Sequence, residues 1–271
     1  MPRRARLDAE LVRRGLARSR DHAAELVAQR RVRIGQVTAT KPATGIDSDT
    51  PLLVQGSSTE SNWVSRGARK LLGALDGLIA GGPAIADRRC LDAGASTGGF
   101  TDVLLHRGAR EVIAVDVGYG QLAWSLRTDQ RVRVLDRTNV RALQPEDIGG
   151  VVDLTVADLS FISLRLALPA LVSCTAADGE LLPMVKPQFE VGRERVGAGG
   201  VVRDPLLRTQ AMLDVLAVAT DLGLGLVDAI ASPVPGPSGN VEYFLWLRRG
   251  PVDTLGPPEE LVQAAVRRGP Q

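Results

Sequence analysis

The chain has 271 residues and a formal net charge of +2, a length that holds one full α/β domain and a small additional module. Its two cysteines have no partners at metal-ligand spacing, so we expect no metal site and a reducing, cytoplasmic compartment. The arginine-rich start is unlike a signal peptide, and no apolar run reaches the roughly 18 residues of a membrane span. We therefore expect no stable association with a membrane.

The basic residues gather at the N-terminus. Residues 1–41 hold eleven Lys or Arg and four Asp or Glu, a net of +7, whereas the remainder has a net of −5. This asymmetry favours contact between the N-terminal region and a polyanion, the alternative being a solvated charged helix. Two short helices are predicted here, the first capped by Asp8 and ended by Gly15, the second beginning at Ser19. A hairpin that turns near Gly35 follows them.

This order of elements resembles the small RNA-binding module of the ribosomal-protein-S-four type, through the segment DAELVRRGLARSRDHAAELVAQRRVRIGQVTATKPAT. The resemblance implies that one face of the helix pair and the hairpin grips structured RNA. The basic residues that we expect to contact phosphates are Arg3, Arg4, Arg6, Arg18, Arg20 and Lys41. Such contacts supply affinity and salt dependence more than sequence specificity. We expect this α+β RNA-binding domain to span residues 1–60, with an interdomain linker at 61–64.

From residue 65 to the end, helical and strand patterns alternate. An amphipathic helix, SRGARKLLGALDGLIA, precedes five strands that contain CLDAG, EVIAVDV, VRVLDRT, VVDLTVADLSF and GELLPMVKPQFEV. Helices join these strands, and YGQLAWSLRTD is predicted to be one of them. Two last strands, around GLVDAIAS and NVEYFLWLRR, are predicted to pair antiparallel. The alternation predicts a Rossmann-like α/β domain with a mostly parallel seven-stranded sheet and helices on both faces.

A turn of small residues follows the first of these strands. Asp92 ends the strand, and the residues that continue into the next helix are Gly94, Ala95, Ser96, Thr97, Gly98, Gly99 and Phe100. A strand that ends in such a turn and opens a helix aims backbone N–H groups at a ligand. The glycine spacing differs from the G-x-G-x-x-G of dinucleotide-binding folds. It resembles motif I of the class I methyltransferases that bind S-adenosylmethionine.

Two more acids stand at the ends of the next two strands. Ligands of open α/β sheets lie beyond the carboxyl ends of the strands. We therefore expect Asp116 to bind the ribose hydroxyls of S-adenosylmethionine and Asp136 to meet its adenine amine, with Asp92 and the turn completing the cofactor site. Taken singly, each acid could instead be a capping, turn or strand-ending residue.

Only three lysines stand among the 33 basic residues, and two of them lie in the α/β domain. Lys70 is on the helix before the first strand, and Lys186 ends the fifth. Asp158 ends the fourth strand and Glu242 opens the last. Because the fourth and fifth strands are expected to neighbour the first, Asp158 and Lys186 should flank the cofactor's methyl group. The alternative is that both lysines form structural ion pairs with these acids.

The order Lys70, Asp158, Lys186, Glu242 resembles the K-D-K-E tetrad of the FtsJ-like ribose 2′-O-methyltransferases. Together, SRGARK, LDAGASTGGFT, DVGYGQL, VADLSFISL, VKPQFEVG and GPSGNVEYFLWL look like the TlyA family, in which an RNA-binding head precedes a methyltransferase domain, here residues 65–271. The resemblance implies that Lys186 is the base that deprotonates the 2′-hydroxyl. Lys70 would favour the neutral form of Lys186 by like-charge repulsion, and the two acids would orient these groups.

The same resemblance implies methylation of cytidine riboses in the 16S and 23S RNA of the small and large ribosomal subunits, linked to susceptibility to capreomycin and viomycin. We expect a monomer that uses S-adenosylmethionine. One departure is the linker, where relatives often carry an arginine-bearing tetrapeptide and this chain has SNWV. Two other functions stay open: a membrane-active, haemolysin-like protein, and an RNA-binding chaperone with a vestigial cofactor site.

Overall fold

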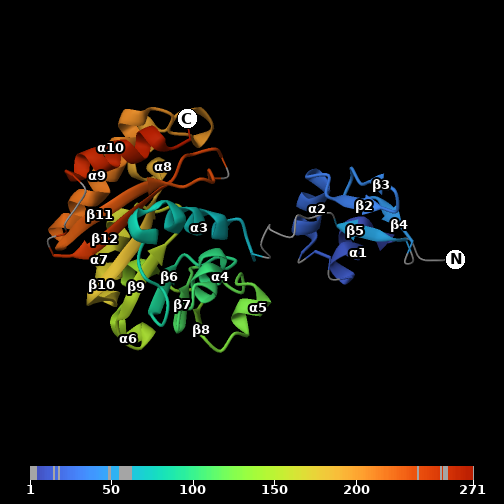
Figure 1. Ribbon diagram of the computed structural model, residues 1–271, viewed down its shortest axis with the longest axis horizontal. Coiled ribbons are helices and arrows are strands. Elements are labelled where there is room, and N and C mark those ends of the chain that lie inside the picture. The colour runs from blue at the N-terminus through green and yellow to red at the C-terminus, as the bar shows by residue number, and fades with distance from the viewer. Residues whose placement is uncertain are drawn as a thin grey trace. The chain divides into compact units, whose positions relative to one another are not determined.

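The computed structural model of the chain (Figure 1) forms two compact units, Met1–Asn62 and Trp63–Gln271, each with its own core. It describes residues 5–14, 16–17, 19–47, 50–54, 63–236, 238–250, 252 and 256–270. Several predicted features lie outside these ranges. They are the phosphate contacts Arg3, Arg4 and Arg18, the helix end at Gly15, and the first half of the linker.

The N-terminal unit contains the predicted helix pair and hairpin. Its elements are β1 (Ala5–Arg6), α1 (Leu7–Arg13), α2 (Arg20–Ala28), β2 (Val32–Ile34), β3 (Val37–Thr38), β4 (Gly45–Ile46) and β5 (Leu52–Val54). The Ser19 hydroxyl accepts a hydrogen bond from the backbone N–H of His22, which confirms the predicted start of α2. Gly35, at a φ of +58°, turns the hairpin β2–β3 as predicted. The strand β5, which pairs antiparallel with β2, was not predicted.

The predicted cap at Asp8 is wrong. The N-cap of α1 is Arg6, and Asp8 lies inside the first turn, where it is buried. The helix begins at Leu7 because this side chain, which is 0% exposed, enters the core of the unit directly after β1 ends. The carboxylate of Asp8 instead accepts hydrogen bonds from the Arg6 side chain.

The C-terminal unit is built on a seven-stranded sheet in the order β11-β12-β10-β9-β6-β7-β8. Its strands are β6 (Arg89–Ala93), β7 (Glu111–Val115), β8 (Val132–Leu135), β9 (Val152–Ala157), β10 (Thr175–Val185), β11 (Leu224–Ala231) and β12 (Tyr243–Arg249). The strands β8, β7, β6, β9 and β10 run parallel, and β12 pairs antiparallel with both β10 and β11. The predicted α/β fold with its mostly parallel sheet is confirmed.

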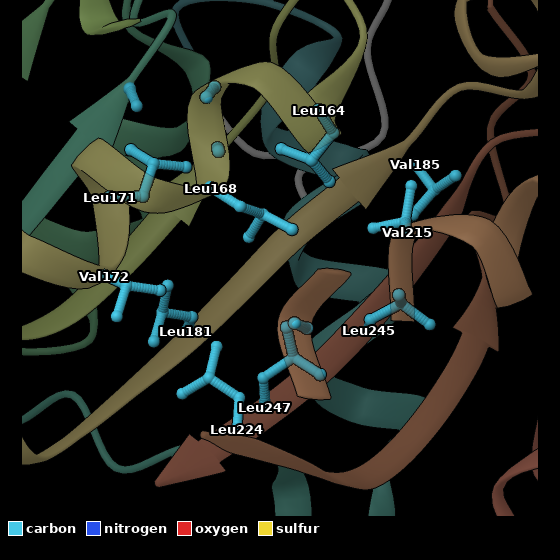
Figure 2. Packing of buried hydrophobic residues seen from close by; sticks show 14 of the residues in the cluster. Leu164, Leu168, Leu171, Val172, Leu181, Val185, Val215, Leu224, Leu245 and Leu247 are labelled. Carbon is cyan, nitrogen blue, oxygen red and sulfur yellow. The ribbon is translucent and has the colours of Figure 1, made fainter. Parts of the chain in front are cut away.

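Helices cover both faces of this sheet, as predicted (Figure 1). One face carries α3 (Gly67–Gly77), α4 (Gly99–His106) and α5 (Trp124–Arg127), and the other carries α6 (Pro145–Ile148), α7 (Leu164–Cys174), α9 (Pro205–Asp221) and α10 (Pro258–Arg268). Successive side chains of each strand point to opposite faces of the sheet and so enter the two cores in turn. In β10, Leu181 and Val185 face α7 and α9 (Figure 2), whereas Leu182 and Met184 face the α3–α4 side.

Three expectations about this unit need correction. The helix predicted over YGQLAWSLRTD covers only Trp124–Arg127, and Gly120, at a φ of +67°, lies in the turn before it. The segment PQFE forms the short helix α8 (Pro187–Glu190) and not the end of a strand, because proline fixes φ and lacks the N–H that a ladder needs. The strand β10 lies next to β9 and not next to β6.

The remaining local structure is short. In the described residues, 3₁₀ segments span Ile79–Gly81, Val140–Ala142, Arg193–Arg195 and Ala198–Gly200. The helix α9 begins where predicted, because the Asp204 carboxylate accepts from the N–H of Leu206. The helix α10 is part of the core: Val262, Ala265 and Val266 are buried with residues of the sheet.

Candidate active site

A cavity of about 270 Å³ lies at the carboxyl ends of β6, β9 and β10. It is lined by Ser65, Arg66, Gly67, Lys70, Gly94, Ala95, Ser96, Thr97, Gly99, Phe100, Asp158, Ser160, Lys186 and Glu242. All four predicted catalytic residues and six of the predicted cofactor residues therefore share one cavity. This is the edge of an α/β sheet at which ligands bind.

The glycine turn forms one wall of the cavity by approaching other backbone segments closely. A Cβ atom at Gly94 would lie 2.6 Å from the carbonyl oxygen of Asp158, and Gly94 has a φ of +86°. A Cβ atom at Gly99 would lie 2.8 Å from the backbone nitrogen of Ala68, at the start of α3. These glycines thus allow the turn to pack directly against the backbones of Asp158 and Ala68, and the turn that lines the cavity fits the predicted S-adenosylmethionine.

Asp92 supports this turn from beneath. Its side chain is 0% exposed, and Oδ2 accepts a hydrogen bond of 2.6 Å from the hydroxyl of Thr101 on α4. Burial, with the nearby Asp158 and Asp116 carboxylates as smaller contributions, raises the pKa of Asp92 to about 7. Asp92 is absent from the cavity lining, so it holds β6 to α4 and would influence a ligand through the turn.

The other two predicted cofactor acids lie beside the turn. Asp116 accepts from the backbone N–H of Ser96 at 2.8 Å and from that of Gly118 at 2.7 Å. The first of these bonds holds Ser96 at its left-handed φ of +47°. Asp136 accepts from both terminal nitrogens of Arg127 at 3.0 Å. Neither acid lines the cavity, and neither does Gly98, so their contacts with a cofactor stay predictions.

The four predicted catalytic side chains form a continuous chain of charges. Lys70 Nζ lies 2.5 Å from Glu242 Oε2 and 4.0 Å from Asp158 Oδ2. Lys186 Nζ lies 2.5 Å from Asp158 Oδ1 and donates to the Ser160 hydroxyl at 2.8 Å. Asp158 therefore bridges the two lysines.

These four groups are nearly removed from solvent. Lys70, Lys186 and Glu242 are 5%, 7% and 1% exposed, and only Asp158 is half-buried. Two cations and two anions compensate one another, which is the condition for charges to persist at such burial. The arrangement can hold a hydroxyl group, accept its proton and orient it toward a neighbouring electrophile.

Sequence reasoning missed several residues at this site. Ser65, Arg66 and Gly67 line the cavity from the start of α3. Arg66 and Gly67 are four and three residues before Lys70, a spacing that places them on the same helix face and could have signalled their position. Ser160 is a polar residue two positions after Asp158, at the same end of the sheet, and this position could have signalled its role.

An exposed aromatic side chain stands directly after Ser160. Phe161 is 92% exposed and has a φ of +64°, which is rare for a bulky residue. Its ring centroid lies 5.4 Å from that of Phe189 on α8, three residues after Lys186. Because exposed aromatic rings can stack on nucleobases, Phe161 is a candidate contact for a nucleic acid at the cavity.

The predicted RNA contacts that the structure describes lie in the N-terminal unit. Arg6 and Arg20 both form ion pairs with Asp8, at 2.8 Å and 3.2 Å, and Lys41 is exposed. In the part of the chain that the structure describes, no group of three or more metal-ligating side chains could hold a metal ion. No helix built from the described residues has both the length and the apolar character needed to cross a membrane.

Comparison with known proteins gives matches for both units of the chain. Residues 63–249 match the family described as FtsJ-like methyltransferase, and residues 5–50 match the S4 domain. A Mycobacterium tuberculosis protein named 16S/23S rRNA (cytidine-2′-O)-methyltransferase TlyA is 60% identical over 100% of both chains. A Bacillus subtilis protein named putative rRNA methyltransferase YqxC is 40% identical over 96% of this chain and 92% of its own. A solved structure of a putative hemolysin from Streptococcus thermophilus has a TM-score of 0.75 and 36% identity, covering 99% of this chain and 96% of its own.

Proposed function

The chain belongs to the FtsJ-like methyltransferase family and carries an N-terminal S4 domain, and from this premise we propose that it transfers a methyl group from S-adenosylmethionine to a ribose 2′-hydroxyl of ribosomal RNA. The relatives named as rRNA methyltransferases, at 60% and 40% identity, support this substrate. One observation carries the proposal: the side chains of Lys70, Asp158, Lys186 and Glu242 are linked by ion pairs in the cavity bounded by the glycine turn.

Different residues of the cavity bind the cofactor and transfer the proton. When bound, S-adenosylmethionine supplies an electrophilic methyl group on a positively charged sulfur. The turn from Gly94 to Gly99 lines the cavity and would hold the cofactor there. Lys186 accepts the proton of the 2′-hydroxyl at its Nζ atom once that atom has released its own proton, and Asp158 orients Nζ from 2.5 Å. Lys70, fixed by Glu242, contributes a second positive charge 4.0 Å from the same carboxylate.

Much of this catalysis is positioning. A ribose hydroxyl becomes an effective nucleophile only when its proton has an acceptor and its oxygen is aligned with the methyl carbon. The cavity floor is nearly closed to water around Lys70, Lys186 and Glu242, which strengthens the electrostatic effect of each charge. The exposed ring of Phe161 lies shortly after Asp158 in the chain. An RNA base that is lifted out of its stack could lie against this ring.

The finer assignment follows the relative of highest identity among those compared above. We infer cytidine as the nucleotide, 16S and 23S RNA as the substrates, and the cytoplasm as the compartment in which both subunits are reached. The S4 domain supports action on both subunits, because it adds RNA-binding surface to the catalytic domain. We further propose a monomer, and we propose that loss of the methylation confers resistance to capreomycin and viomycin.

The decisive experiment measures transfer of tritiated methyl from S-adenosylmethionine to separated, unmodified 30S and 50S subunits, followed by mapping of the modified ribose. We expect one 2′-O-methylcytidine in each subunit. Lys186→Ala should bind the cofactor with normal affinity in calorimetry and transfer no methyl. Transfer to protein or free cytidine but not to subunits would refute the assignment, and near-normal transfer by Lys186→Ala would refute the role of this lysine.

The name hemolysin, which the Streptococcus thermophilus structure carries, raises the alternative of a membrane-active protein. The methyltransferase family match and the charged cavity favour RNA methylation over this alternative. Leakage of liposomes caused by the Lys186→Ala variant would support the membrane activity. Tight binding of S-adenosylmethionine would argue against an RNA chaperone with a vestigial cofactor site.

A further inference from the structure

One buried carboxylate in the N-terminal unit holds two exposed arginines. Asp8 is 4% exposed, whereas the side chains of Arg6 and Arg20 are 52% and 59% exposed. Asp8 Oδ1 accepts from Arg6 Nε at 3.1 Å, and Oδ2 accepts from terminal nitrogens of Arg6 at 2.8 Å and of Arg20 at 3.2 Å. Arg6 ends β1 and Arg20 begins α2, so a single acid joins cations from two separate elements.

The arginines keep most of their hydrogen-bonding capacity in this arrangement. A guanidinium has five N–H donors, and Asp8 engages two on Arg6 and one on Arg20. The planar donors that remain match the oxygens of a phosphate group. Because Asp8 holds both side chains before any ligand arrives, binding need not include the entropy cost of ordering them.

We propose that Asp8 is a positioning residue that presents Arg6 and Arg20 as a preformed clamp for a phosphate of the RNA backbone. This inference rests on the proposed function, because it takes ribosomal RNA as the ligand. The proposal predicts the opposite effect on RNA affinity from the one that net charge predicts when Asp8 is neutralised. A carboxylate near the RNA repels phosphates, so Coulomb's law alone predicts tighter binding when Asp8 is neutralised. A clamp that depends on Asp8 predicts weaker binding.

The carboxylate is ionised under any condition in which RNA binding would be measured. Hydrogen bonding by Arg6, opposed by burial and aided by Arg20 and the N–H of Ala9, holds the pKa of Asp8 at about 2. The charge is therefore present at neutral pH, and Asp8→Asn removes a full negative charge from the unit.

The chain supplies a matched control on the same helix. Glu10 is also buried, at 3% exposed, and accepts hydrogen bonds from Arg13 and Arg14. Glu10→Gln therefore changes the net charge of the unit by the same amount as Asp8→Asn. It leaves Arg6 and Arg20 in place. If charge alone governs RNA binding, the two variants behave alike.

The test uses the full chain and purified 50S subunits that lack the modification, with filter binding at several salt concentrations. We expect Asp8→Asn to bind about tenfold more weakly, as when ordered side chains lose their preorganisation. We expect Glu10→Gln to bind equally or more tightly. Arg6→Lys keeps the charge but cannot form the fork, so it should also weaken binding, and it carries the test if Asp8→Asn does not fold. Equal tightening by Asp8→Asn and Glu10→Gln would overturn the proposal.

A double-mutant comparison separates positioning from folding. In an Arg6→Ala, Arg20→Ala background, Asp8→Asn should cause no further loss of affinity, because its effect passes through those two side chains. A further loss would show that Asp8 acts on the fold and would overturn the proposal. If Arg6→Ala and Arg20→Ala bind 50S subunits normally, these arginines do not contact RNA and the RNA-binding part of the proposed function fails as well. If they bind weakly and Asp8→Asn does not, only the clamp is wrong.

Discussion

The buried acid beneath the glycine turn should make the stability of the C-terminal unit depend on pH. The pKa of Asp92 is raised from 3.8 to about 7, first because the group is buried. The folded state therefore binds a proton that the unfolded state releases between pH 3.8 and about 7, so the free energy of unfolding falls as pH rises through this window. Each pKa unit corresponds to about 1.4 kcal/mol, which gives about 4 kcal/mol over the whole window.

Asp92→Asn removes this titration. About two of the three pKa units lie between pH 5 and pH 8, so over that interval wild type should lose about 2 to 3 kcal/mol more than Asp92→Asn. Urea unfolding followed by tryptophan fluorescence measures this difference for the correct unit. All three tryptophans, Trp63, Trp124 and Trp246, lie in the C-terminal unit.

A second variant sharpens the test. The Thr101 hydroxyl donates to Asp92 and lowers its pKa, opposing the effect of burial. Thr101→Val should therefore raise the pKa of Asp92 further and extend the loss of stability to higher pH. Parallel pH profiles for wild type, Asp92→Asn and Thr101→Val would refute the reasoning.

Three further predictions concern the site itself. Gly94→Ala should weaken binding of S-adenosylmethionine at least tenfold in calorimetry, because its Cβ would lie 2.6 Å from the backbone carbonyl oxygen of Asp158 and would displace the turn. Gly223→Ala, also at a positive φ but with nothing within 4 Å of the new Cβ, should bind normally. Phe161→Ala should lower kcat/KM for ribosomal subunits about tenfold with unchanged cofactor affinity, the loss expected for one base–aromatic stack; an unchanged kcat/KM would exclude that contact. Glu242→Ala should lower the free energy of unfolding by about 3 kcal/mol, because it leaves Lys70 buried without the carboxylate that lies 2.5 Å away. Equal urea midpoints for wild type and Glu242→Ala would contradict this.

Much of the fold was accessible from pattern alone. The alternation of strand and helix periods predicted the seven-stranded sheet, because burial on both faces requires apolar residues throughout each strand. The start of α9 at Asp204 and the start of α2 after Ser19 were also predicted, because capping depends on residues that are adjacent in sequence. Local rules failed at Asp8, where a residue of a capping type forms ion pairs with two arginines that lie in other elements.

The candidate site was also predictable from the sequence only in part. The residue types at the strand ends, together with their resemblance to a family motif, were enough to point to Asp158, Lys186 and Glu242. Sequence placed Asp92 among the cofactor contacts, whereas the fold places it beneath the turn, bonded to Thr101. Which atoms face the cavity depends on the path of the backbone and on side-chain packing. The spacing of residues along the sequence determines neither.

The sequence by itself therefore determined which chemical groups stand at the ends of the strands and that a glycine turn opens a helix there, since both follow from short-range order along the chain. Only the tertiary structure decided how those groups pair. Lys70 meets Glu242, which is 172 residues away, and Asp158 lies between the two lysines because β9 and β10 are neighbours in the sheet. Distances between side chains far apart in sequence are set by the order of the strands and by the packing of α3 against the turn, and those are properties of the folded chain.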